Sequence, residues 1–224
     1  MARATASPCQ TDLVNGSATI LLVTALVIAV LDWWAVARRI PLLEYFCKPA
    51  AAVAFLLCAG ALDPAVPEAR TWLVVALVFC VVGDVFLMVP RDAFLAGLGS
   101  FAVAQIIFCI SFAVREPTAT RAVVGLLVVS IGTSILARRF VGALRRSGAR
   151  SMVPPVLAYV AVISAMVASA IAGGTAVAIV GAVLFMISDS LIAEERFVRS
   201  RRWQRLAIIV SYHLALAGLV LGLV

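Results

Sequence analysis

Charged residues are scarce in this sequence: aspartate, glutamate, lysine and arginine make up 13% of its 224 residues, whereas hydrophobic residues make up 64%. A typical soluble domain has about 25% charged and about 45–50% apolar residues. So few charges cannot cover the surface of a water-soluble domain. The composition therefore predicts an integral membrane protein, in which length is counted in spans of about 20 residues each.

Patterns typical of metal and nucleotide sites are lacking as well. The chain has one histidine, His213, which excludes a histidine-rich metal site. Its five cysteines include no Cys-x-x-Cys pair. No metal or other cofactor is expected, and the cysteines in apolar runs are expected to be small buried side chains. There is also no P-loop, no Gly-x-Ser-x-Gly and no His-Glu-x-x-His.

Apolar stretches between helix breakers predict eight transmembrane helices and hence an all-α fold, a polytopic helix bundle. The expected spans are 17–37, 43–62, 71–89, 93–114, 120–138, 153–172, 174–193 and 204–223. Residues 1–16 are polar and rich in small side chains, which predicts a flexible N-terminal tail before a single transmembrane domain, 17–224. Loops are expected at 61–70, 115–121 and 138–151, with the shortest turn at Gly173–Gly174.

Positive charges are distributed unevenly between the two sides of this predicted bundle. The loops after the first, third, fifth and seventh spans hold 14 of the 18 lysines and arginines, counting Lys48 with its nearest loop. The positive-inside rule places such loops in the cytoplasm, so both termini are expected outside the plasma membrane. Because the arginines form short clusters between spans, the net charge of +7 indicates orientation, and no nucleic-acid partner is expected.

Two aspartates fall inside predicted spans. Asp84 lies late in the third span and Asp189 late in the seventh, each five or six residues before the cytoplasmic end, or roughly 8–9 Å deep at ~1.5 Å per residue. Intramembrane carboxylates are costly and mark functional sites by default. We expect these two to face one cavity open toward the cytoplasmic side, as an acid beside a base. The alternative is that each only caps or hydrogen-bonds a neighbouring helix.

The positions of the aspartates also suggest an internal duplication. If each half has four spans, both halves enter the membrane from the same side. Each half then carries its aspartate in its third span, directly after a small residue, Gly83 or Ser188. Identity between the halves is slight, and the pattern is compatible with two parallel four-helix repeats.

Other polar side chains are weaker candidates. Lys48 begins the second span near Glu44, and it either reaches to the membrane interface or holds an anionic head group. Asp32 is expected to pair with Arg38 or Arg39. The serines next to Asp189 can also bond backbone carbonyls one turn back, and a lone histidine on an apolar helix is often a satisfied core residue. The candidate substrate-binding residues besides Lys48 are Gln105, Tyr159, Ser188, Ser190, Tyr212 and His213.

The sequence around these residues resembles a known family. The runs GDVFLM, FLAGLGSFAVAQIIFCISF and GAVLFMISDSLIAEERF, with Lys48–Pro49 and AYVAVISAM, resemble the lysoplasmalogenase (YhhN-like) family of small integral membrane proteins. The resemblance covers residues from about 45 to about 215. Two departures stand out. Gln105 occupies a place where members often carry histidine. In the last span, SYHLALAG, Leu216 replaces the usual glutamine and His213 replaces an aromatic residue.

The resemblance implies hydrolysis of the vinyl ether bond of lysoplasmalogens to a fatty aldehyde and glycerophospho-ethanolamine or glycerophospho-choline. This chemistry needs an acid that protonates the β-carbon, and an anion that stabilises the oxocarbenium ion and activates water. Two coupled carboxylates fill both roles, so Asp84 and Asp189 are the expected catalytic residues, with the acid unassigned. Lys48 is expected to contact the phosphate. The expected partners are the lysoplasmalogen and membrane lipids, with the oligomeric state left open.

Two other functions stay open from the residues alone. In a small transporter, the aspartates would be proton or cation sites at a repeat interface. Both aspartates lie toward one face, however, and the spans lack the Gly/Pro interruptions of a broken-helix site. A purely structural scaffold leaves the buried acids unexplained. Aldehyde release from a lysoplasmalogen would indicate the enzyme, whereas flux in liposomes would indicate the transporter.

Overall fold

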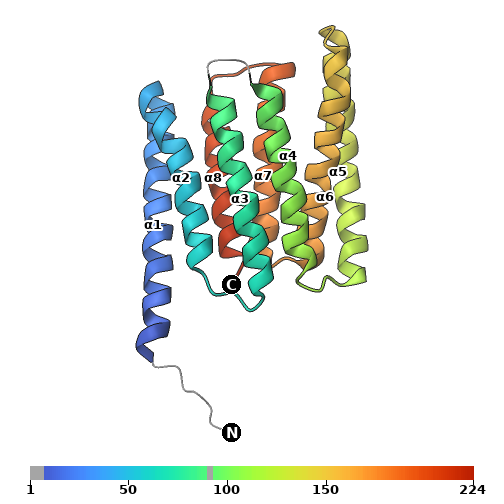
Figure 1. Cartoon of the computed structure of the whole chain (residues 1–224). Helices are drawn as coiled ribbons and strands as arrows, with labels where there is room; N and C mark the ends of the chain where they lie inside the picture. Colours follow the sequence, from blue (N-terminus) through green and yellow to red (C-terminus); the bar gives the residue numbers. More distant parts are fainter. Residues whose placement is uncertain (1–7, 90–92) are drawn as a thin grey trace.

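The computed structural model describes residues 8–89 and 93–224, and within them the chain forms eight α-helices and no strand (Figure 1). All eight are long and apolar enough to cross a membrane, which confirms the predicted all-α transmembrane bundle. The helices are α1 (Pro8–Arg38), α2 (Pro41–Ala61), α3 (Pro67–Met88), α4 (Phe94–Ala113), α5 (Ala119–Arg146), α6 (Val153–Gly173), α7 (Ala176–Phe197) and α8 (Gln204–Leu221), with a short 3-10 helix, η1 (Arg150–Met152), before α6.

Proline and threonine set the start of several helices. α2 and α3 begin at Pro41 and Pro67, where the missing N–H of proline interrupts no helical hydrogen bond. The side chains of Thr118 and Thr175 accept a backbone N–H in the first turn of α5 and α7. α6 ends at Gly173, as the predicted turn required. A Cβ there would collide with a backbone carbonyl of α4, so glycine permits the close approach.

Some predicted boundaries were wrong. The expected loop 138–151 is helical up to Arg146, because Phe140 and Leu144 extend the apolar face of α5 onto α6. Arginine is also a good helix former, so a run of arginines does not end a helix. α7 likewise extends to Phe197. α1 begins at Pro8 and its apolar span at Gly16. Residues 1–7 lie outside the described part, and the flexible tail 1–16 stays a prediction.

Six helices form a closed ring. In order around it, α2 packs on α3, α3 on α4, α4 on α6, α6 on α7, α7 on α8, and α8 on α2. α1 lies outside the ring against α2 and α8, and α5 lies outside it against α6 and α7. The helix contacts of the first four helices recur among the last four. The pair α1–α2 corresponds to α5–α6, α2–α3 to α6–α7, α3–α4 to α7–α8, and α4–α6 to α8–α2. This recurrence supports the two predicted four-helix repeats. It also places α3 and α7 opposite each other.

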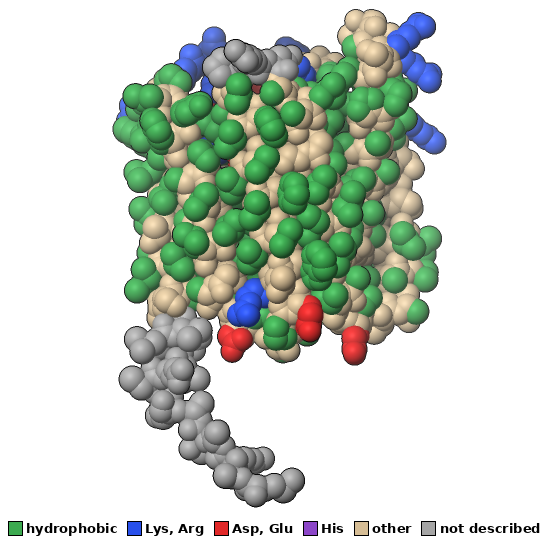
Figure 2. All heavy atoms as spheres, in the orientation of Figure 1, with side chains coloured by type: hydrophobic (Ala, Val, Ile, Leu, Met, Phe, Trp, Pro, Cys, Tyr) green, Lys and Arg blue, Asp and Glu red, His purple; other side chains and the backbone are tan. Residues whose placement is uncertain are grey.

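The outer surface is apolar around the helices and charged at the ends. Figure 2 shows hydrophobic side chains over the sides. Most of the visible Lys and Arg lie at the end where α1 meets α2 and α5 meets α6, and acidic side chains lie at the other end with basic atoms beside them. In the most apolar stretch of α5 only 11% of the residues are buried, against 61% in α8, so α5 faces lipid. The predicted gathering of the basic loops is confirmed, although Arg91 lies outside the described residues. Their cytoplasmic location stays a prediction.

Candidate active site

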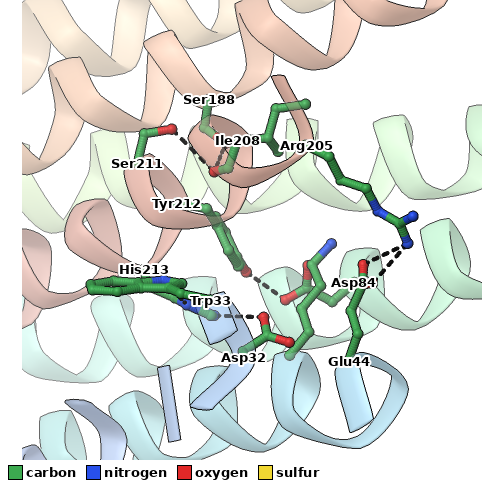
Figure 3. Close-up of polar contacts among 11 residues, drawn as sticks. Asp32, Trp33, Glu44, Asp84, Ser188, Arg205, Ile208, Ser211, Tyr212 and His213 are labelled. Carbon is green, nitrogen blue, oxygen red and sulfur yellow. Dashed lines mark hydrogen bonds and ion pairs between the residues drawn. The ribbon is translucent and has the colours of Figure 1, made fainter. Parts of the chain in front are cut away.

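Asp84 is the centre of a buried charged cluster. Its side chain is fully buried, with Lys48 Nζ 3.1 Å from Oδ1. The Tyr212 hydroxyl donates a hydrogen bond to Oδ2 at 2.6 Å (Figure 3). A cation and an O–H donor on the two oxygens both stabilise the charged carboxylate. Lys48 is thus turned inward onto α3, so the predicted alternative, a side chain reaching to the membrane interface, is wrong.

Asp189 has different partners. The Tyr159 hydroxyl donates to its Oδ2, and no cation forms an ion pair with it among the described residues. Asp189 is partly accessible and lines an apolar cavity with Tyr159, Phe101 and Ile163. It lies within electrostatic range of both Asp84 and Lys48. Asp189 is therefore the aspartate that an apolar ligand can reach.

Each helix of the ring contributes at least one of the predicted residues. Opposite helices carry related pairs: Lys48 on α2 and Tyr159 on α6, Asp84 on α3 and Asp189 on α7, Gln105 on α4 and Tyr212 on α8. The two aspartates lie on opposite helices of the ring, with α2 and α8 between α3 and α7 on one side and α4 and α6 on the other. The space between them holds aromatic rings in edge-to-face contact, including Phe101 and Phe185.

The prediction that Asp84 and Asp189 face one cavity is wrong, and the site instead has two cavities that adjoin. Asp189 lines the apolar cavity. Lys48 lines a second cavity of about 490 Å³, here called the charged mouth, together with Glu44, Glu195, Arg196 and Arg205. Both are lined by Leu87, Phe94 and Ile192. Asp84 lines neither, because Lys48 and Tyr212 cover its carboxylate. The site is amphipathic, with one apolar and one charged compartment.

The remaining predicted residues differ in how free they are to bind a ligand. Gln105 is fully buried near Tyr159, and its amide forms no hydrogen bond of normal geometry within the described part of the chain. The Ser190 hydroxyl donates to the Met186 carbonyl one turn back at 2.6 Å. The Ser188 hydroxyl donates to the Ile208 carbonyl of α8 at 3.0 Å. The serine hydroxyls are thus engaged by backbone, and their substrate role stays a prediction.

Sequence reasoning misplaced Asp32. It does not pair with Arg38 or Arg39. It is fully buried and lies 4.0 Å from Nε2 of His213. Figure 3 shows Asp32, Asp84, Tyr212 and His213 converging from α1, α3 and α8. A signal was present in the sequence: Ala25, Ala29, Asp32 and Val36 recur at helical spacing, and all four are buried. This small-residue stripe marks the inward face of α1.

Comparisons with known proteins give one consistent result. The model of the YhhN family matches residues 43–223. Lysoplasmalogenases of Mycobacterium bovis and Mycobacterium tuberculosis are each 33% identical over 172 residues, 72% of this chain and 64% of their own length. Lysoplasmalogenase TMEM86B of Mus musculus is 34% identical over 156 residues, 68% of this chain and 63% of its own. The chain thus spans slightly less than two thirds of these relatives. No solved structure matches it.

Proposed function

Because this chain belongs to the YhhN family, with relatives named lysoplasmalogenase, we propose that it is a membrane hydrolase that cleaves the vinyl ether bond of lysoplasmalogens. The products are a fatty aldehyde and glycerophospho-ethanolamine or glycerophospho-choline. The observation that carries the proposal is a carboxyl group, Asp189, in an apolar cavity that adjoins a charged one. The vinyl ether of a lysoplasmalogen likewise joins an apolar chain to a charged head group.

The two compartments match the two ends of such a lipid. The alkenyl chain enters the apolar cavity from the membrane, which brings its vinyl ether beside Asp189. The head group lies in the charged mouth, where Lys48 and Arg205 attract the phosphate and Glu44 and Glu195 attract the ammonium group. Glu44 and Arg205 already form an ion pair at 2.7 Å, so the mouth presents both signs of charge to a zwitterion.

The partners of the two aspartates support different roles for them. Lys48 and Tyr159 hold the same place in the two repeats, each on the second helix and each bonded to the aspartate of the third helix. Asp84, with the cation, is the anion of the pair. Asp189, with a tyrosine and apolar surroundings, carries the proton. Their different surroundings thus give the two carboxyl groups different roles, Asp84 as the anion and Asp189 as the acid.

The proposed reaction returns both groups to their starting states. Asp189 protonates the β-carbon, and the charge of Asp84 stabilises the oxocarbenium ion. Asp84 then takes a proton from the attacking water, which forms a hemiacetal. In the second half, Asp84 gives this proton to the leaving ether oxygen while Asp189 takes the hydroxyl proton of the hemiacetal, releasing aldehyde and alcohol. Lys48 covers Asp84, so it must shift, and the substrate phosphate gives it a partner.

The experiment is aldehyde release by purified protein in detergent from a lysoplasmalogen. The expected result is aldehyde from the wild type and from Asp63→Asn, a loop aspartate with a side chain 82% exposed, and almost none from Asp189→Asn. A lysophospholipid with an ester in place of the vinyl ether should release no aldehyde. Proton or cation flux into liposomes without aldehyde release would refute the enzyme and favour a transporter.

A further inference from the structure

Asp32 of α1 is a carboxylate that the proposed reaction does not use. Its side chain is 0% exposed, and neither oxygen accepts a hydrogen bond from the residues that the structure describes. It lies in a helix long and apolar enough to cross the membrane, where an unpartnered ionisable group is costly and marks function by default. It also lies outside residues 43–223, which match the family. Asp32 is therefore contributed by α1, a helix that lies before the residues matched by the family model.

Three helices build the surroundings of Asp32. α1 packs against α2 and α8, which carry Lys48 and His213. Nδ1 of His213 accepts a hydrogen bond from the Trp33 indole N–H at 3.1 Å, so the proton of the neutral imidazole belongs to Nε2. That nitrogen lies 4.0 Å from Oδ2 of Asp32. The Trp33 ring stacks on the imidazole. The histidine N–H is thereby held toward Asp32.

Lys48 links Asp32 to the proposed reaction. Its ammonium lies 3.1 Å from Asp84, and Asp32 lies within electrostatic range of both Lys48 and Asp84. Glu44 and Arg205 also lie within that range, but their charges compensate each other in an ion pair at 2.7 Å. Lys48 is the cation that the two buried aspartates have in common.

We propose that Asp32 is a positioning residue that acts through Lys48, as the second counter-charge of the ammonium group, oriented by His213 and Trp33. The catalytic consequence rests on the proposed function. When Asp84 takes the proton of the attacking water, it loses its negative charge, and Asp32 keeps the ammonium paired inside the membrane. Without Asp32 this step leaves the ammonium with the substrate phosphate as its single counter-charge in an apolar medium, which slows hydrolysis.

The pairing can be tested without any substrate. Lys48 is the only lysine in the chain, so acetylation by acetic anhydride with peptide mapping reports on its amine alone. The wild type and the single variants Asp32→Asn and Asp84→Asn each retain at least one carboxylate that keeps the Lys48 amine protonated. Acetylation of Lys48 should therefore be slow in all three proteins. In the double variant we expect a rate at least about tenfold higher than in either single variant, because a buried lysine without a counter-charge readily gives up its proton.

Two outcomes would overturn the pairing: Asp84→Asn acetylated as fast as the double variant, or a double variant no faster than the single ones. If the Asp32 variants yield little folded protein, the acetylation rate of Lys48 in Asp84→Asn alone tests the pairing. A rise of about tenfold or more above wild type in that variant would leave Asp84 as the sole partner of Lys48. Asp63→Asn is the matched control and should acetylate at the wild-type rate.

Aldehyde release tests the catalytic consequence. We expect Asp32→Asn to lower kcat by about 10–100-fold, as loss of a supporting charge around a reacting group does. KM should stay within about twofold, because Asp32 touches no substrate. Asp32→Glu keeps the charge and should recover most of the rate, which a merely structural role would not predict. An unchanged kcat in Asp32→Asn contradicts the catalytic part. A wild type without activity refutes the proposed function, and acetylation then still decides the pairing.

Discussion

Replacing Asp189 with asparagine removes the proton of the proposed acid and keeps the shape of the side chain. Vinyl ether hydrolysis should fall by about 10²–10⁴-fold, the usual loss for a general acid–base group. At about 1.36 kcal/mol for each tenfold change, the barrier rises by roughly 2.7–5.4 kcal/mol. Asp84→Asn should show a loss of the same order. The double variant should be little worse than the more impaired single one, because the two groups act as a unit.

The two substitutions should differ in their effect on stability. An asparagine oxygen at position 189 still accepts the Tyr159 hydrogen bond, so the free energy of unfolding should change by less than about 1 kcal/mol. Asp84→Asn removes the charge that Lys48 and Tyr212 bind at 3.1 and 2.6 Å in a fully buried site. Hydrogen bonds to charged groups contribute about 1.5–3 kcal/mol. We expect Asp84→Asn to lower the free energy of unfolding by that amount.

Aldehyde release and thermal unfolding in detergent measure the two effects on the same samples, with Asp63→Asn as the control that changes neither. Aldehyde release near the wild-type rate in both asparagine variants would show that the aspartates are structural, and the proposed mechanism would fail. Equal destabilisation by both substitutions would contradict the assignment of Asp84 as the anion and Asp189 as the acid.

Three further results are expected. Lys48→Ala should raise KM by removing a phosphate contact and also lower kcat by at least about tenfold, because Lys48 holds Asp84; a change in KM alone would confine it to head-group binding. Leu98→Trp should raise KM at least about tenfold by filling the apolar cavity, whereas Val128→Trp, 59% exposed on α5, should not. A reporter fused after Val224 should read as extracytoplasmic, and a cytoplasmic signal would reverse the orientation taken from the arginine count.

The fold could largely be predicted because hydrophobic length is a strong local signal. In the part of the chain that the structure describes, the eight apolar stretches form eight helices, and the Gly173–Gly174 turn lies where two helix breakers are adjacent. The end of α5 could not be read in the same way. Arginines at its C-terminus predict a loop by polarity, but the apolar Phe140 and Leu144 between them pack on α6. The packing of these apolar side chains on α6 therefore outweighs the local polarity of the arginines.

The site was harder to predict because spacing along a helix does not determine what lies across the bundle. Depth alone matched Asp84 with Asp189, and the structure places them on opposite helices of one ring. Depth could not show that Lys48 turns inward, or that Asp189 borders a cavity while Asp84 is covered by Lys48 and Tyr212. Asp32 was assigned to nearby arginines because sequence proximity favours such pairs. The ionisable group that the structure places beside it is His213 of α8, far along the chain.

The recurrence of helix contacts in the two halves relates Asp84 and Asp189 by an approximate twofold axis along the membrane normal. Strict symmetry gives related groups identical environments, and identical environments give neither carboxyl group a preference for the single proton. Lys48 and Tyr159, which hold the same place in the two halves, break that symmetry. A protein with two identical halves would have two equivalent acids and no defined donor. In the proposed mechanism, the difference between Lys48 and Tyr159 gives the pair of acids a direction for proton transfer.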